Sequence, residues 1–176
     1  MAKGNTLMPF GYEVEKETAK GTLLVIGIFD DPEAEHVPEL IRLGAERSFH
    51  KLVLLPQHEE TLRRMKLQAE LPYYKRVHGL NGWLEEHQPQ LPVQIDEWEG
   101  KRQKYTPLDT LLQFAVDKYK APHFVAMTDT YANAFATYAS FDEWIRRVRL
   151  LVVTKPGFEP HPKLAARDNR WEAVYM

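Results

Sequence analysis

The stretch GIFDDPEAEH, residues 27–36, contains four carboxylates and one histidine. It directly follows an aliphatic run at residues 23–26. An aliphatic run followed by a short polar stretch is typical of a strand that enters a strand–helix turn. Free backbone N–H groups and the helix dipole make such turns favourable places for phosphate groups. His36 could donate a hydrogen bond to a phosphate oxygen or to a developing negative charge. The stretch therefore has the layout of a nucleotide site, yet it puts acidic side chains where a phosphate would lie.

Pro38 predicts where the following helix begins. Proline inside a helix costs about 3 kcal/mol, whereas the first helical turn tolerates it because no N–H is needed there. The helix is therefore expected to start near residues 36–38. This leaves residues 30–35 as a loop and places His36 at the mouth of the helix.

Two other interpretations of the acidic turn remain open. In the first, the carboxylates are solvated and simply complement the positive end of the helix. In the second, Asp30, Glu33 and His36 converge on a divalent metal ion. The Glu-x-x-His spacing occurs only once here, whereas di-iron bundles need two copies and further glutamates.

Alternating strand and helix patterns predict the elements that would position the turn. Buried strands are expected at residues 22–29, 51–56, 91–98, 123–127 and 149–157, and helical patterns at 58–71, 74–88 and 107–119. Thr106 is the expected N-cap of the last helix, with Asp109 completing a capping box. Glycines 79 and 82 weaken the second helical pattern. This order predicts an α/β fold, a Rossmann-like doubly wound parallel sheet of about five strands.

Composition limits the classes of function. The chain has 176 residues, 44% of them hydrophobic and 27% charged, with a net charge of -2 and no cysteine. Such a chain predicts one domain over residues 21–176 after an N-terminal extension at 1–20, without disulfides or thiolate metal sites. The lack of a basic excess argues against a nucleic-acid surface. Because no stretch reaches the roughly 20 apolar residues of a membrane span, we expect a cytoplasmic protein without a membrane partner. Homo-oligomers remain possible.

Three segments in order resemble a known enzyme family. They are IGIFDDPEAEH (26–36), KYTPLDTL (104–111) and HFVAMTDTYANAFATYASFDEWIRRVRLLVVTKPG (123–157). Together they resemble the bacterial nicotinate-nucleotide adenylyltransferases of the H-x-G-H nucleotidyltransferase superfamily. The resemblance covers roughly residues 22–157.

The resemblance implies a reaction and roles for particular residues. The reaction joins ATP and nicotinate mononucleotide into deamido-NAD and pyrophosphate, with Mg²⁺ accompanying the ATP and no metal ligand assigned to the protein. His36 would be the catalytic residue that stabilises phosphate charge. The implied nucleotide-binding residues are Gly27, Ile28, Phe29, Asp30, Glu33 and Asp129. The residues implied for the nicotinate half are Tyr105, Thr106, Asp109 and Tyr138.

Departures from the family pattern qualify the implied activity. Glu33 stands in place of the first histidine, Glu35 in place of the glycine, and Met127 in place of the glycine before Asp129. The family's C-terminal S-T-x-I-R phosphate segment has no counterpart in this sequence. We therefore expect a nucleotide to bind at the first turn, with weak or lost catalysis. The alternative is a non-catalytic relative that binds a nucleotide or a protein on the same scaffold.

Overall fold

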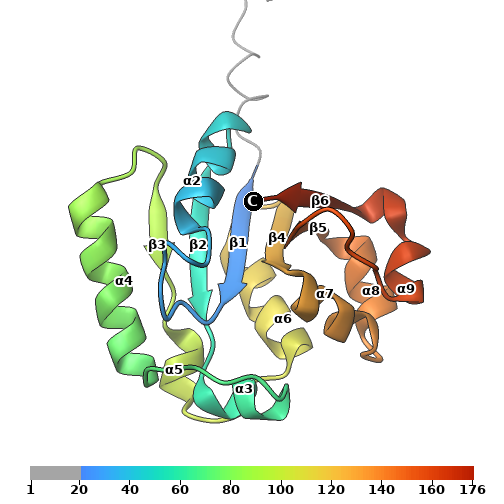
Figure 1. The fold of residues 1–176 in the computed structure, drawn as a ribbon, viewed down its shortest axis with the longest axis horizontal. Coiled ribbons are helices and arrows are strands. Elements are labelled where there is room, and N and C mark those ends of the chain that lie inside the picture. The colour runs from blue at the N-terminus through green and yellow to red at the C-terminus, as the bar shows by residue number, and fades with distance from the viewer. Residues whose placement is uncertain (1–20) are drawn as a thin grey trace, which may run out of the picture.

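A single parallel sheet organises the chain, as the computed structural model shows for residues 21–176 (Figure 1). Its six strands lie in the order β3-β2-β1-β4-β5-β6, and every neighbouring pair is parallel. They are β1 (Thr22–Gly27), β2 (Lys51–Pro56), β3 (Val93–Ile95), β4 (His123–Thr128), β5 (Arg149–Thr154) and β6 (Trp171–Tyr175). The predicted Rossmann-like fold is confirmed, with one strand more than the five expected. The predicted extension at residues 1–20 lies outside the described residues.

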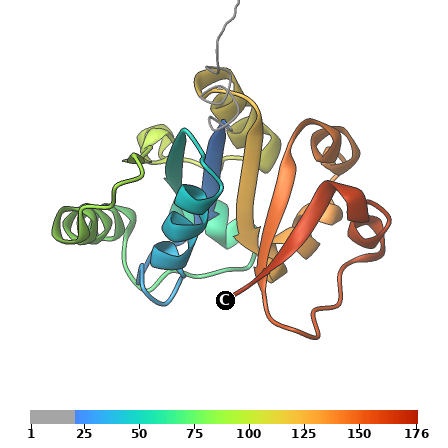
Figure 2. The same cartoon turned by 90° about the horizontal axis from the view of Figure 1, so that it is seen from above.

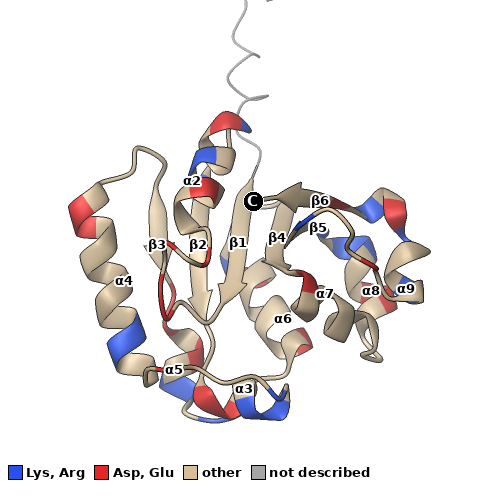
Figure 3. Ribbon diagram, in the orientation of Figure 1, with Lys and Arg blue, Asp and Glu red and all other residues tan. Residues whose placement is uncertain are grey.

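Helices cover both faces of the sheet. They are α2 (Val37–Glu46), α3 (Glu59–Arg64), α4 (Tyr73–His87), α5 (Trp98–Arg102), α6 (Leu108–Lys118), α7 (Asp129–Ala136), α8 (Phe141–Arg147) and α9 (Pro162–Ala165), with a 3₁₀ turn, η2, at Asp168–Arg170. Figure 2 shows α2 and α6 on opposite sides of the strands. Figure 3 shows acidic and basic residues side by side on α2, α3 and α8.

No helix within residues 21–176 is long and apolar enough to span a membrane.

The alternation of side chains along the strands divides the interior into two cores. On β1, Leu24 and Ile26 pack with α6, α7 and α8, whereas Leu23 and Val25 pack with α2 and α4. All four of these side chains are buried. Because successive strand residues point to opposite faces, one uninterrupted apolar run serves both cores.

Several predicted elements differ from the observed ones. The strands predicted at residues 22–29 and 149–157 end at Gly27 and Thr154. The helix predicted at residues 58–71 ends at Arg64, and Lys66 adopts a left-handed conformation with φ 61°. The strand predicted at 91–98 is limited to β3, because Asp96 turns the chain and accepts a hydrogen bond from the Trp98 amide (2.9 Å) into α5. The expected capping box of α6 does not form.

Proline explains the missing capping box. Pro107, rather than Thr106, occupies the N-cap position of α6 and has no side-chain group that could cap the helix. The backbone N–H of Thr106 instead donates to Thr61 Oγ1 (2.9 Å). By contrast, α4 runs without a break through Gly79 and Gly82, which weakened its prediction.

Candidate functional site

The topology concentrates strand ends around one crevice. The chain leaves β1 towards β2 in one direction, whereas β4 leads to β5 in the other, so β1 and β4 form the switch point of the sheet (Figure 1). In open α/β sheets this crevice at the carboxyl ends of the strands is where ligands bind. A cavity of about 480 Å³ lies there. Its lining residues are Val25, Ile26, Gly27, Phe29, Ala34, Glu35, His36, Leu40, Ala126, Met127, Thr128, Asp129, Val153, Thr154, Lys155, Pro156, Gly157, Phe158 and Met176.

The first strand–helix turn forms one wall of the cavity. Phe29 adopts a left-handed conformation (φ 62°) and buries its ring, and His36 repeats that conformation (φ 64°) as the N-cap of α2. Pro38 falls within the first turn of the helix. The predicted loop at residues 30–35 and the predicted helix start near 36–38 are thus confirmed.

Glu35 fills the concave side of this turn. Its Oε1 accepts a hydrogen bond from the Phe29 amide (2.7 Å), and its Oε2 accepts one from the Asp31 amide (3.3 Å). Backbone N–H groups that converge in this way also bind phosphate groups in nucleotide-binding turns. The carboxylate of the chain itself therefore lies where a phosphate would be expected.

His36 reaches the cavity from the helix mouth. Its side chain is 31% exposed, and its Nδ1 lies 3.9 Å from Glu39 Oε1. Within residues 21–176, neither of these two buried atoms has a hydrogen-bond partner. The imidazole can therefore turn towards a ligand without losing a bond to the protein.

The opposite wall carries an anchored carboxylate and a lysine. Asp129 Oδ2 accepts a hydrogen bond from the hydroxyl of Thr154 (2.8 Å), and its Oδ1 accepts one from the Thr130 amide (2.6 Å). Lys155 Nζ donates to the main-chain oxygen of Met176 (3.1 Å). Asp129, which the resemblance implies as a nucleotide-binding residue, is the first residue of α7 and lines the cavity.

The other implied nucleotide-binding residues divide between the cavity and the outer side of the turn. Gly27 and Phe29 line the cavity, whereas Ile28 does not and its carbonyl instead accepts a hydrogen bond from Arg76. Asp30 points away and accepts from the amides of residues 70 and 71 (2.9 and 3.0 Å). Glu33 also points away: its Oε2 accepts from Trp83 Nε1 (2.8 Å).

The metal-site interpretation of the turn is wrong for these residues. Asp30, Glu33 and His36 point in different directions, towards the loop before α4, towards Trp83 and towards the cavity. In the part of the chain that the structure describes, no three His, Asp or Glu side chains gather as metal ligands would.

The residues implied for the nicotinate half do not line the cavity. Burial raises the pKa of the Tyr138 hydroxyl, and Tyr105 raises it further. Arg64 stacks over the Tyr105 ring at 4.5 Å. Asp109 instead borders a separate surface depression beside Trp98 and Trp144. The structure therefore places none of the four residues implied for the nicotinate half on the cavity wall.

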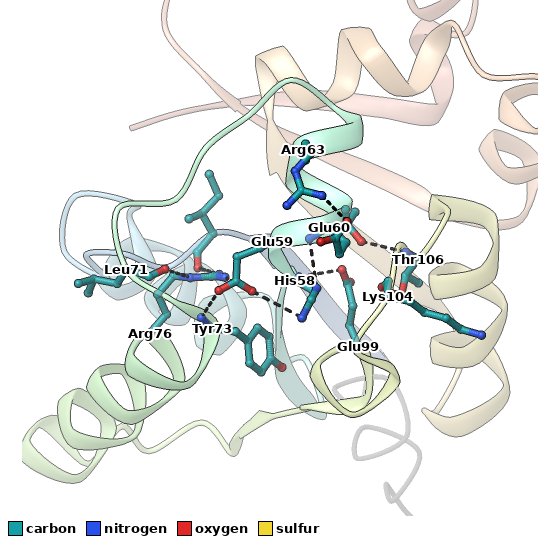
Figure 4. Close-up of polar contacts among 12 residues, drawn as sticks. His58, Glu59, Glu60, Arg63, Leu71, Tyr73, Arg76, Glu99, Lys104 and Thr106 are labelled. Carbon is teal, nitrogen blue, oxygen red and sulfur yellow. Dashed lines mark hydrogen bonds and ion pairs between the residues drawn. The ribbon is translucent and has the colours of Figure 1, made fainter.

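A buried arginine that the sequence reasoning missed supports the first turn. Arg76 is 1% exposed; its Nη1 donates to the Ile28 carbonyl (2.8 Å) and its Nε to the Leu71 carbonyl (2.9 Å). Glu59 Oε1 lies 3.8 Å from its Nη2 (Figure 4). The signal was present in the sequence, because Arg76 adjoins Val77 and lies four residues before Leu80 on the buried stripe of the helix.

Comparisons with known proteins agree with this architecture. No protein-family model and no curated protein matches the sequence. Among solved structures, the nicotinic acid mononucleotide adenylyltransferase of Plasmodium falciparum complexed with NaAD matches with a TM-score of 0.67 at 9% identity, over 89% of this chain and 75% of that chain. The same enzyme complexed with APC matches with a TM-score of 0.62 at 10% identity, over 88% and 74%. The chain thus shares its fold with these nucleotidyltransferases.

Proposed function

We propose that this chain binds a nucleotide in the 480 Å³ cavity, as an adenylyltransferase-like protein. One observation carries the proposal: the cavity occupies the switch point of a 3-2-1-4-5-6 sheet, the position where such folds bind nucleotides. Its size suits a ligand of that class. The fold shared with two nucleotidyltransferase structures supports the same conclusion.

We propose further that adenylyl transfer from ATP to nicotinate mononucleotide is weak or absent. Phosphoryl transfer depends on groups that position the reactants and neutralise charge. Only His36 offers a titratable nitrogen from this turn, since the position that the resemblance assigns to a first histidine holds Glu33, which binds Trp83. Positive charge at the cavity is also limited, because Lys155 is the one lysine or arginine among its described lining residues.

Magnesium would enter with ATP rather than occupy a site made by the protein. Among residues 21–176 no three His, Asp or Glu side chains cluster for a metal ion. Two of the carboxylates at the cavity, Glu35 and Asp129, are already engaged with backbone N–H groups. The residues present do not fit a metal site held by the protein, so no step of the proposed function runs through one.

Nucleotide binding without turnover is the second candidate function. The specific observation in its favour is that the Glu35 carboxylate accepts hydrogen bonds from two backbone N–H groups of the turn. In this case adenylyl transfer would be lost rather than slow. Both candidates predict a bound nucleotide, and they differ only in the release of pyrophosphate.

Calorimetry with ATP, nicotinate mononucleotide, NAD and deamido-NAD, each with and without Mg²⁺, tests the shared prediction. We expect at least one ligand to bind at millimolar concentration or below and His36→Ala to weaken it. His87→Ala is the matched control, because its ring stacks on Trp83 outside the cavity (4.0 Å). No binding by any of the four ligands would contradict the proposal and favour a protein partner.

Pyrophosphate release from ATP and nicotinate mononucleotide separates the two candidates. Slow release that disappears in His36→Ala would support a weakened enzyme. Undetectable release with intact binding would support the silent relative. Rapid release that persists in His36→Ala would show that the active site lies elsewhere.

A further inference from the structure

The turn after β1 is built as an anion-binding turn, and the anion in it is a side chain of the same molecule. Two amides, those of Phe29 and Asp31, point at the two oxygens of Glu35 over 2.7 and 3.3 Å. Phe29 itself has a left-handed backbone conformation (φ 62°). Paired N–H groups of this kind recognise a carboxylate and a phosphate by the same chemistry.

Glu35 also borders the cavity. Glu35, Phe29 and His36 all belong to the cavity lining. A phosphate that entered this corner would find the two amides already bonded and would meet a carboxylate at close range. Like charges repel strongly at such distances when the surroundings are partly shielded from water.

We infer that Glu35 is the specificity-determining residue of the cavity. It excludes phosphate from the turn, so the cavity accepts a nucleoside in preference to the corresponding triphosphate. The inference rests on the proposed nucleotide-binding function and names the ligand class within it: nucleosides, and nucleotides whose phosphates lie outside the turn. The exclusion is local, because it depends on one carboxylate and two amides.

The neighbouring Glu33 provides a matched control within the same loop. It carries the same charge two residues earlier, but its Oε2 accepts from Trp83 Nε1 (2.8 Å) and lies 3.7 Å from His87 Nε2, away from the cavity. A substitution at Glu33 changes the net charge of the molecule by the same amount as one at Glu35. Any difference between the two therefore reports position and not overall charge.

Calorimetry with adenosine, AMP and ATP in EDTA measures the discrimination directly. The proteins compared are wild type, Glu35→Gln, Glu35→Gly and Glu33→Gln, each first checked by circular dichroism and thermal melting. We expect wild type to bind adenosine more tightly than ATP. Both Glu35 variants should gain about tenfold or more in ATP affinity, with adenosine affinity changed less than about twofold. The gain should shrink in high salt, because mobile ions screen the repulsion.

Three results overturn the inference, and each identifies what failed. If the wild-type protein binds ATP more tightly than adenosine, the inference is overturned, even if both Glu35 variants fail to fold. If the folded Glu35 variants bind adenosine but have the ATP affinity of wild type, Glu35 does not exclude phosphate. The same holds if Glu33→Gln gains as much ATP affinity as the Glu35 variants. Either result leaves the nucleotide cavity in place. Absence of binding by all three ligands to every protein overturns the inference, and the proposed function fails with it only if nicotinate mononucleotide, NAD and deamido-NAD also do not bind.

Discussion

Glu99 is a carboxylic acid enclosed by the protein at the carboxyl end of the sheet. It is 2% exposed; its Oε2 accepts a hydrogen bond from the His58 amide (2.8 Å), and its Oε1 has no partner within the described residues. Burial raises the pKa of Glu99 to about 7, although Thr61, His58 and nearby arginines act in the opposite direction. Desolvation dominates because it disfavours the charged form.

Glu99 should make the protein less stable as the pH rises through neutrality. Because the pKa of the native carboxyl lies above the ordinary value of 4.5, the native state holds a proton that the unfolded state has lost. This contribution to the free energy of unfolding is fully present below pH 4.5 and is lost as the pH rises through about 7. Between pH 5.5 and 8 the loss should be about 2 kcal/mol, as measured by urea unfolding.

Glu99→Gln supplies the comparison, since it keeps an oxygen for the His58 amide but cannot ionise. Its free energy of unfolding should rise relative to wild type by about 2 kcal/mol from pH 5.5 to 8. Glu143→Gln is the matched control, because that carboxylate lies at the surface and its side chain is 67% exposed. A constant difference between Glu99→Gln and wild type at the two pH values would show that Glu99 does not titrate in this range.

The direction of individual side chains in the acidic turn could not be predicted from the sequence. The order of residues identified the turn, but Glu33 and Glu35 were both assigned to the phosphate region. In the structure, Glu35 accepts a hydrogen bond from the Phe29 amide of the turn, whereas Glu33 accepts one from Trp83. Side-chain direction depends on the backbone angles of each residue. Here the left-handed Phe29 and the Asp31 carboxylate, which accepts from the Glu33 amide (3.0 Å), set those angles. Neither feature has a sequence pattern as regular as that of a helix or strand.

At the scale of elements, the periodicity of apolar residues predicted the buried faces of helices and strands, whereas local hydrogen bonds and proline determined where the helices begin and end. The apolar faces of β1, β2 and α6 followed directly from their patterns and are buried as expected. The end of α3 and the start of α6 did not, because competing hydrogen bonds and Pro107 determine them. Short elements such as α5 and α9 contain too few turns for a period to be recognised.

Helix α4 carries two glycines that the fold does not require. A Cβ atom added at Gly79 or at Gly82 would meet no atom within 4 Å. Alanine loses less backbone entropy on folding and favours the helix, so Gly79→Ala and Gly82→Ala should each stabilise the protein by about 0.5–1 kcal/mol. Urea unfolding would measure this gain.

Gly100 in α5 supplies the contrasting variant. A Cβ atom there would lie 2.2 Å from the ring of Tyr73, so Gly100→Ala should destabilise the protein although alanine favours helices. Equal effects at residues 79, 82 and 100 would contradict the assignment of an open surface to α4 and a close contact to α5.

At the scale of the whole molecule, the fold could be predicted although the sequence identity to the matched solved structures is very low. Alternating strands and helices, with right-handed crossovers, restrict the possible sheets to a few. The fold matches that of solved structures with only 9% and 10% identity, at TM-scores of 0.67 and 0.62. The cavity follows from this order, because the switch point leaves the ends of β1 and β4 uncovered. What fills the cavity depends on single residues, and for this reason the fold was easier to predict than the ligand.

Because β1 contributes to both cores, the described domain should unfold as one cooperative unit. Leu23 and Leu24 are adjacent and fully buried, but Leu23 faces α2 and α4, whereas Leu24 faces α6, α7 and α8. Leu23→Ala and Leu24→Ala should each lower the free energy of unfolding by about 2–5 kcal/mol. Each should also shift the unfolding midpoint on both faces of the sheet by the same amount, since neither core can persist without β1.

Single-tryptophan proteins can measure the two faces separately. One protein keeps only Trp83, which packs against the core of α2 and α4, and the other keeps only Trp144, which is buried in the opposite core; the other tryptophans become phenylalanine. Fluorescence during urea unfolding should give coincident transitions for the two reporters, before and after either substitution. If Leu24→Ala shifted the Trp144 transition and left that of Trp83 in place, the two cores would be independent folding units and β1 would not couple them.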